Sequence, residues 1–199
     1  MKTFNSPFST TKIISNDHRM MMRNMIVKWL FIFGCLMTTQ VAATEISSQS
    51  KKFLAVGDVA PQFVIQRLNG SQFSLADYKG KKPVYLIFWN TWCGYCIKKI
   101  PKINAIARQY RQDIEILAIN TSWSDNLGAI SEFQTEHQTD YPMAFDDEAV
   151  ITKSYHVWGA PTEFIIDING VVVHRDNIPD AFDTHIARWQ KTSCQQEVC

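Results

Sequence analysis

The chain has 199 residues, enough for one domain of about 150 residues and a leader. Its composition, 46% hydrophobic and 20% charged, is that of a globular protein and excludes collagen, coiled-coil and wholly disordered classes. Residues 1–43 carry five basic side chains against one acidic, a balance of +4; since the whole chain sums to +1, residues 44–199 carry −3. This mildly acidic body argues against nucleic acid as a partner, because phosphate binding needs clustered Lys and Arg.

Residues 1–43 have the features of an export signal. The basic stretch 19–28 precedes the apolar run Trp29–Met37, which is shorter than the roughly 20 residues that a bilayer span needs. Val41–Ala43 then offers the small residues that signal peptidase prefers. An uncleaved membrane anchor is the alternative, and Cys35 raises a lipoprotein, although the residues before it fit a lipobox poorly. We therefore predict a periplasmic or extracytoplasmic protein.

The folded domain is predicted over residues 56–191, after a flexible, polar lead-in at 44–55. Its first feature is a β-hairpin, in which Gln62–Leu68 and Gln72–Leu75 flank the turn dipeptide Asn69-Gly70.

The middle of the domain alternates strand and helix. Val84–Trp89 is a run of six apolar or aromatic residues, typical of a central strand buried on both faces. From Cys93 to Arg111 apolar residues recur at helical spacing, and Pro101 should kink this helix. Ile114–Ile119 reads as a second buried strand.

The last third adds helices and a strand pair. Helices are predicted at residues 125–137, 148–155 and 179–191. Strands at 163–167 and 171–175 flank Asn169-Gly170, a dipeptide suited to a type I′ turn. This order predicts an α/β fold with a mixed central sheet flanked by helices.

The chemistry centres on Cys93-Gly94-Tyr95-Cys96. A Cys-x-x-Cys motif can hold zinc, attach haem or cycle between dithiol and disulfide. Haem attachment is excluded because Ile97, not His, follows the motif. A structural zinc needs four ligands, and the remaining cysteines of the domain's end lie about 100 residues away in a tail. A purely structural disulfide across four residues would constrain almost none of the chain, so cycling between dithiol and disulfide is favoured. We expect no metal and no cofactor besides this redox-active disulfide.

The motif stands where a buried strand turns into a helix, whose N-terminus carries about half a positive charge. Such positions lower a thiol pKa from about 8.5 to 7 or less. We expect Cys93, the more exposed sulfur, to be the nucleophile that attacks a partner disulfide, and Cys96 to resolve the mixed disulfide.

Three blocks then carry a family resemblance. They are Phe88–Cys96 followed by Pro101, the upstream stretches 56–63 and 74–81, and the downstream stretch 155–170. Together they resemble the TlpA/ResA-like, or redoxin, branch of the thioredoxin-like superfamily. The resemblance implies a thioredoxin-like fold with an N-terminal β-hairpin extension and an extracytoplasmic thiol–disulfide oxidoreductase.

The resemblance also implies that the Ala160–Pro161 bond is cis and packs beside Cys93, exposing the backbone of Ala160 to a substrate strand. From the residues alone, a trans turn proline opening a strand would be preferred. Substrate contacts are expected from Trp92, Gly94, Tyr95, Ala160 and Pro161. The implied partners are proteins with cysteines and a membrane electron donor of the DsbD/CcdA type, with the chain itself a monomer.

One departure from the family pattern concerns a missing acid. The family places a carboxylate beneath the second cysteine, but the two usual positions hold Ile87 and Lys99, and the sequence suggests no substitute. Without a proton acceptor, Cys96 should lose its proton more slowly. Lys98 and Lys99 could instead favour thiolate, although a solvated helix surface is the preferred interpretation for both.

Other residues have simpler interpretations. The tail 192–199 holds Cys194 and Cys199, expected to form a disulfide, with a second shuttle pair as the alternative. Trp89 is expected either at the apolar rim of the active site or in the hydrophobic core. The scattered histidines are expected on the surface or in ordinary packing: His137, His156, His174 and His185.

We predict an enzyme that exchanges the Cys93/Cys96 disulfide with cysteines of exported proteins as a reductant, for example in cytochrome c maturation or disulfide repair. The alternatives are a thiol peroxidase of the redoxin type, against which the intact Cys-x-x-Cys counts, and a non-catalytic thioredoxin-fold binding module.

Overall fold

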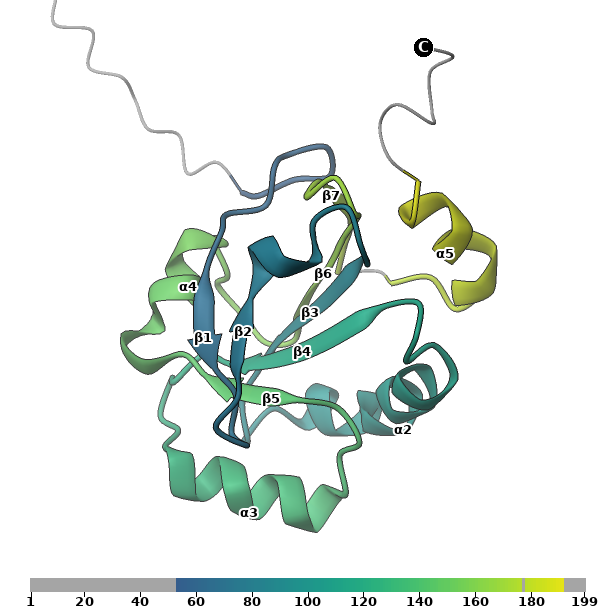
Figure 1. The fold of residues 1–199 in the computed structure, drawn as a ribbon. Helices are drawn as coiled ribbons and strands as arrows, with labels where there is room; N and C mark the ends of the chain where they lie inside the picture. Colours follow the sequence, from purple (N-terminus) through teal and green to yellow (C-terminus); the bar gives the residue numbers. More distant parts are fainter. Residues whose placement is uncertain (1–52, 177, 192–199) are drawn as a thin grey trace, which may run out of the picture. The chain divides into compact units, whose positions relative to one another are not determined.

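The computed structural model describes residues 53–176 and 178–191. The predicted leader at 1–43 and the cysteine tail at 192–199 lie outside the described residues, so both remain predictions. The elements follow in chain order (Figure 1): β1 Val64–Gln66, β2 Gln72–Ser74, η1 Leu75–Tyr78, β3 Val84–Trp89, α2 Gly94–Gln109, β4 Glu115–Asn120, α3 Leu127–His137, β5 Met143–Phe145, η2 Asp147–Ala149, α4 Val150–Ser154, β6 Thr162–Ile166, β7 Val172–Arg175 and α5 Phe182–Trp189.

The central sheet is mixed and has five strands in the order β5-β4-β3-β6-β7. β3 runs parallel to β4, which runs parallel to β5, whereas β6 is antiparallel to both β3 and β7. β3 is therefore the middle strand, and all six of its residues are buried. This confirms the predicted α/β class and the predicted central strand.

The pleat of β3 divides the core in two. Tyr85, Ile87 and Trp89 pack in the apolar cluster that contains the buried faces of α2, α3 and α5. The alternate residues of β3 pack with Phe73 of β2 and Tyr155 in the second cluster. Because successive strand residues point to opposite faces, the continuous apolar run follows from burial on both sides.

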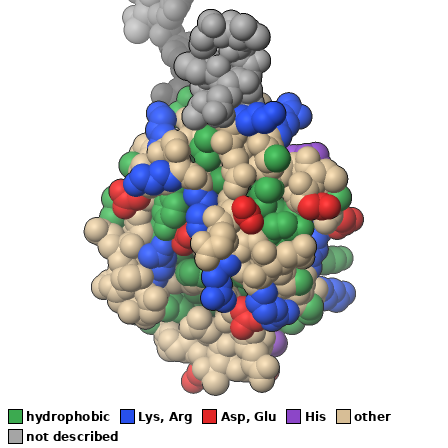
Figure 2. Space-filling view, turned by 45° about the vertical axis from the view of Figure 1, so that its right-hand side comes forward, with side chains coloured by type: hydrophobic (Ala, Val, Ile, Leu, Met, Phe, Trp, Pro, Cys, Tyr) green, Lys and Arg blue, Asp and Glu red, His purple; other side chains and the backbone are tan. Residues whose placement is uncertain are grey.

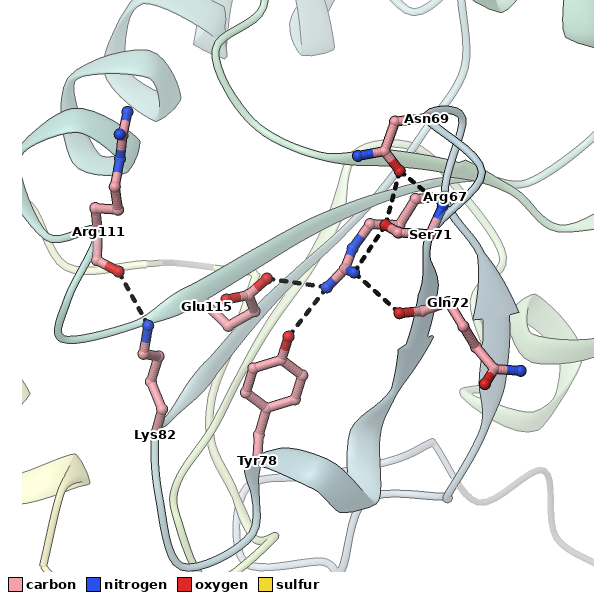
Figure 3. A network of polar contacts seen from close by, with 8 residues as sticks. All are labelled: Arg67, Asn69, Ser71, Gln72, Tyr78, Lys82, Arg111 and Glu115. Carbon is pink, nitrogen blue, oxygen red and sulfur yellow. Dashed lines mark hydrogen bonds and ion pairs between the residues drawn. The ribbon is translucent and has the colours of Figure 1, made fainter.

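The predicted N-terminal hairpin is present, with β1 paired to β2 in antiparallel register. Figure 3 shows how Arg67, the residue after β1, connects this hairpin to the central sheet. Its guanidinium donates to the carboxylate of Glu115 at 3.1 Å and to the hydroxyl of Tyr78 at 3.0 Å. Burial, followed by the charge of Glu115, raises the pKa of Tyr78, so its hydroxyl stays protonated.

Several local details differ from the sequence-based expectations. The predicted 179–191 helix begins at Phe182, and the turn at Asn169-Gly170 is not type I′, because only Gly170 has a positive φ. β5 was not expected; it is three residues long and forms by pairing with β4 and, through Ala144, with Arg67. The predicted 148–155 helix is interrupted at its start, because Glu148 and Ala149 adopt positive φ of 60° and 54° before α4 begins.

On the face that Figure 2 shows, basic and acidic side chains are interspersed among exposed apolar ones.

Candidate active site

Cys93 and Cys96 lie where β3 passes into α2. Cys93 is the N-cap residue of α2, and its Sγ accepts a hydrogen bond from the backbone N–H of Cys96 at 3.2 Å. The two are joined by a disulfide, with their Cα atoms 5.2 Å apart. In this disulfide form both residues are buried, 5% and 6% exposed, and both belong to the same apolar cluster.

A polar network that sequence reasoning missed fixes the loop before Cys93. Asp125 accepts hydrogen bonds from the backbone N–H of Thr91 at 2.9 Å and from the Thr91 hydroxyl. It also accepts from the side-chain amides of Asn120 at 2.7 Å and Asn90 at 3.2 Å, both of which are fully buried. Partial burial raises the pKa of Asp125, but these hydrogen bonds outweigh it and hold the pKa below its ordinary value.

The predicted start of the following helix was two residues early for the same reason. Asp125 belongs to this network, and Asn126 is the N-cap of α3, accepting from the backbone N–H of Ala129 at 3.0 Å. The signal for the network was an Asp-Asn pair shortly after a strand end, where the sequence analysis placed the first residues of the helix.

The exposed rim of the site is aromatic. Trp92 is 59% exposed and Tyr95 74% exposed, whereas Trp89 is buried in the core. The indole N–H of Trp92 donates to the carbonyl of Trp123 at 2.9 Å, which anchors the ring to the loop after β4. Trp158, which the sequence interpretation did not single out, is 57% exposed in the segment before β6.

The Ala160–Pro161 peptide bond is cis, as the resemblance implied. Pro161 lines the same small cavity as Cys96, so the structure brings the proline and the motif together. The hydroxyl of Thr162, the first residue of β6, donates to the carbonyl of Gly159 at 2.7 Å and closes the turn. Gly94 is exposed at the first position of α2, and Ala160 is half-buried.

A buried acid that the sequence analysis did not single out lies on the strand next to β3. Glu163 of β6 pairs in register with Ile87 of β3, and its side chain is 2% exposed. Its carboxylate accepts a hydrogen bond from the hydroxyl of Tyr85 at 2.9 Å and lies 2.6 Å from the ammonium of Lys99. The sequence held a signal for this arrangement, since an acid directly precedes the apolar run Phe164–Ile166.

This geometry also corrects the interpretation of the two lysines. Lys98 is exposed, with its ammonium 5.3 Å from the centre of the Tyr95 ring, as a surface residue should be. Lys99 is only partly a surface residue: its side chain is 39% exposed, but its ammonium pairs with the buried carboxylate of Glu163.

A cavity of about 10 Å³ lies beside Cys96, lined among others by Lys99, Trp89 and Tyr141. This volume suits a single water molecule. The indole nitrogen of Trp89 is one of two buried side-chain nitrogens, among the described residues, without a hydrogen-bond partner. Burial raises the pKa of Tyr141 far above its ordinary value, so its hydroxyl is protonated.

Three of the histidines in the described residues pack against aromatic or other ring side chains. His174, His185 and the indole of Trp189 form a cluster of rings with centroids 5.5 to 5.6 Å apart. His137 lies 4.3 Å from the ring centre of Phe133. Within residues 53–176 and 178–191, no three His, Cys, Asp or Glu side chains gather as metal ligands would. In the same ranges, no helix has the length and hydrophobicity of a membrane span.

Comparison with known proteins now adds to this geometry. The model of the AhpC/TSA family matches residues 56–175. The chain belongs to the AhpC/TSA family. It is 36% identical over 121 residues to "Thiol-disulfide oxidoreductase ResA" of Bacillus thuringiensis subsp. konkukian. The match covers 60% of this chain and 68% of that protein.

Two further relatives of this AhpC/TSA-family chain extend the comparison. It is 30% identical over 180 residues to "Thioredoxin-like protein YneN" of Bacillus subtilis, covering 87% of this chain and 98% of that protein. The crystal structure of a secreted Mycobacterium tuberculosis disulfide oxidoreductase matches with a TM-score of 0.55 at 25% identity, covering 64% and 96% of the two chains. The fold is therefore thioredoxin-like, and the resemblance to the ResA-like redoxin branch is confirmed.

Proposed function

We propose that this chain is a protein thiol–disulfide oxidoreductase that opens and closes the Cys93–Cys96 disulfide against cysteines of other proteins. The observation that carries this proposal is a disulfide at the N-cap of α2, in contact with the cavity that the cis-proline also lines. The ResA relative, named a thiol-disulfide oxidoreductase, supports the same chemistry.

In the reducing direction, the dithiol form begins the cycle. The thiolate of Cys93 attacks one sulfur of a client disulfide, forming a Cys93–client disulfide and releasing the second client thiolate. The thiolate of Cys96 then attacks Sγ of Cys93, which breaks the mixed disulfide and releases the reduced client. Two electrons pass to the client, and the enzyme ends as the disulfide seen in the structure. The free N–H groups and positive end of α2 favour the Cys93 thiolate.

The exposed surface around the disulfide suits a polypeptide client. Trp92 and Tyr95 offer aromatic surface, Gly94 leaves the approach to Cys93 open, and the half-buried Ala160–Pro161 segment offers backbone for pairing with an extended strand. We assign client contacts to these five residues on that basis.

Insulin reduction with dithiothreitol as electron source tests the proposal. The wild-type chain should accelerate it, and Cys93→Ser should abolish the acceleration. Cys194→Ser, the same chemical change outside the motif, is the matched control and should keep full activity. Acceleration that survives in Cys93→Ser would refute the proposal. Turnover of hydrogen peroxide faster than of insulin would favour the peroxidase alternative instead.

The client is a further part of the proposal. We propose that the clients are exported proteins and that the chain reduces them with electrons from a membrane donor of the DsbD/CcdA type. Two observations support this: residues 1–43 have the features of an export signal, and one structural relative is described as secreted. Cys96→Ser cannot resolve the mixed disulfide, so in cells it should trap clients on Cys93. A measured reduction potential near about −270 mV would mark a reductant, and one near about −120 mV an oxidant.

A further inference from the structure

A groove of about 490 Å³ lies between β7 and α5, a volume in the range of small-molecule sites. His174 of β7 lines it, and this residue lies in register with Ile165 of β6, which in turn lies opposite Tyr85 of β3. Tyr85 is near the start of β3, whereas Cys93 follows the end of that strand. The groove is therefore separate from the disulfide and from the client surface around it.

Three side chains that carry or can take up a positive charge line this groove. They are His174 of β7 and, on α5, His185 and Arg188. His185 and Arg188 are three residues apart, so they share one face of the helix. The rings of His174 and His185 have their centroids 5.5 Å apart. Burial, followed by the charges of His185 and Arg188, lowers the pKa of His174, which shows that the three groups act on one another.

Asp167 is the one acidic side chain, among the described residues, that lines the groove with them. Its carboxylate already accepts hydrogen bonds from the backbone N–H groups of Asn169 and Val171, both at 2.9 Å, and from the side-chain amide of Asn169 at 3.0 Å. These bonds hold the turn between β6 and β7. Within residues 53–176 and 178–191, no carboxylate forms an ion pair with Arg188. The groove thus holds a guanidinium without an anionic partner from the described chain.

The remaining walls of the groove are largely apolar. They include the indole of Trp189, on which the ring of His185 stacks with the two planes 15° apart, and the valines at 56, 171, 172 and 173. Two neighbouring imidazoles are also what a metal ion would use. The guanidinium in the same groove repels a cation, however, and no three metal-ligating side chains gather in the part of the chain that the structure describes. The lining therefore favours an anion over a metal.

We propose that this groove binds an organic anion, a molecule with an apolar or aromatic body and one carboxylate, sulfonate or phosphate group. Arg188 donates to the anionic group through its planar set of N–H donors, and His174 and His185 add ring N–H donors. The body of the ligand lies against the valines and Trp189. This site is additional to the disulfide chemistry and does not depend on it.

The two histidines give the proposed binding a pH dependence. The ionisable groups that line the groove with His174 are His185, Arg188 and Asp167. Imidazoles are the side chains whose charge ordinarily changes in the neutral range of pH, so the two histidines are the groups that take up protons. An anion between them offsets the repulsion between their charged forms. Binding is therefore coupled to proton uptake and is tighter at lower pH.

Fluorescence titration of the full-length oxidised protein with anilinonaphthalene sulfonate tests the proposal, because this probe joins an aromatic body to a sulfonate. Phenylnaphthylamine, the same ring system without the sulfonate, is the matched neutral probe. Arg188→Met should weaken binding of the sulfonate by about 10-fold or more and change binding of the neutral probe by less than about 2-fold. His174→Gln combined with His185→Gln should abolish the rise in sulfonate affinity that the wild type shows between about pH 8 and pH 6.

Two control variants locate the bound probe. Arg111→Met removes an exposed arginine just after α2 and should leave the affinity for both probes unchanged. Trp92→Ala removes the exposed indole beside the disulfide, a second surface on which an aromatic probe can lie, and should also leave sulfonate affinity unchanged. If Arg188→Met is unfolded by circular dichroism, His185→Gln alone replaces it and should weaken sulfonate binding by several-fold.

The proposal is overturned if Arg188→Met binds the sulfonate as tightly as the wild type, or if both probes lose affinity equally in that variant. It is also overturned if Trp92→Ala, and not Arg188→Met, removes binding, or if the wild type binds no sulfonate at millimolar concentration. The titration contains no redox step, so its outcome is independent of whether the disulfide turns over.

Discussion

Replacing Asp125 with alanine tests whether the loop before Cys93 is held by that carboxylate. In the variant, the side-chain amide of Asn120, fully buried, loses its acceptor, and that of Asn90 keeps only a 3.4 Å contact with the carbonyl of Trp123. An orphaned buried donor costs about 1–3 kcal/mol. Thr91 lies nearer solvent and can bond to water instead. We therefore expect a loss of about 2–4 kcal/mol in the free energy of unfolding.

Urea denaturation of the oxidised protein at neutral pH measures this loss, with an unchanged m-value indicating that two-state unfolding is retained. The matched control is Asp77→Ala, which removes an exposed carboxylate and should cost less than about 0.5 kcal/mol. A loss in Asp125→Ala no larger than that of the control would refute the argument.

The pH dependence of Asp125 has a definite sign. The pKa of this carboxyl in the folded protein lies below the ordinary 3.8, so the folded state favours the charged form. The contribution is fully present above pH 3.8 and is lost as pH falls through the folded-state pKa. The stability difference between wild type and Asp125→Asn should therefore shrink below pH 3.8.

Three other substitutions test different parts of the molecule. Arg67→Met leaves Glu115 without its guanidinium partner and should lower the free energy of unfolding by about 2 kcal/mol in urea. Burial, followed by the charges of its neighbours, lowers the pKa of His174 below 6.5, so the free energy of unfolding should fall as the pH drops through the window just below 6.5. In His174→Gln, the melting temperature should depend less on pH in this window. Trp92→Ala should lower kcat/KM about 10-fold for a protein disulfide, and less for a small one, since the lost aromatic surface is exposed.

The long apolar runs made the centre of the fold predictable from sequence. Val84–Trp89 is a strand over the predicted residues, and Ile114–Ile119 is shifted by only one residue. β5 escaped prediction because Met143–Phe145 is too short to show a period and follows a proline. It is a strand because β4 and Arg67 pair with it, and pairing between distant segments cannot be predicted from local sequence.

The chemical motif was predictable for a similar reason: its residues are close in sequence. Cys93 to Cys96 fall within one helical turn, so their joint position follows from local structure alone. Asp125 and its partners come together from three different segments, and no spacing rule connects them. The polar groups that surround the disulfide are thus the part of the site that needs the tertiary structure.

Glu163, the buried acid on β6, lies at a position that spacing along the chain does not reveal. The two positions along the chain where the family usually has the acid hold Ile87 and Lys99, and neither is a carboxylate. The sheet offers a third route to the same space, since β6 lies antiparallel to β3 with Glu163 opposite Ile87. Residues directly opposite in adjacent strands point to the same face, so the pairing register alone carries Glu163 to the side that faces α2. The lysine and the acid then lie together because a charge on the helix and a charge on the strand both need a partner away from water. A lysine where an acid is expected is therefore a reason to look for the acid on the neighbouring strand, at the position that the register places beneath the cysteine.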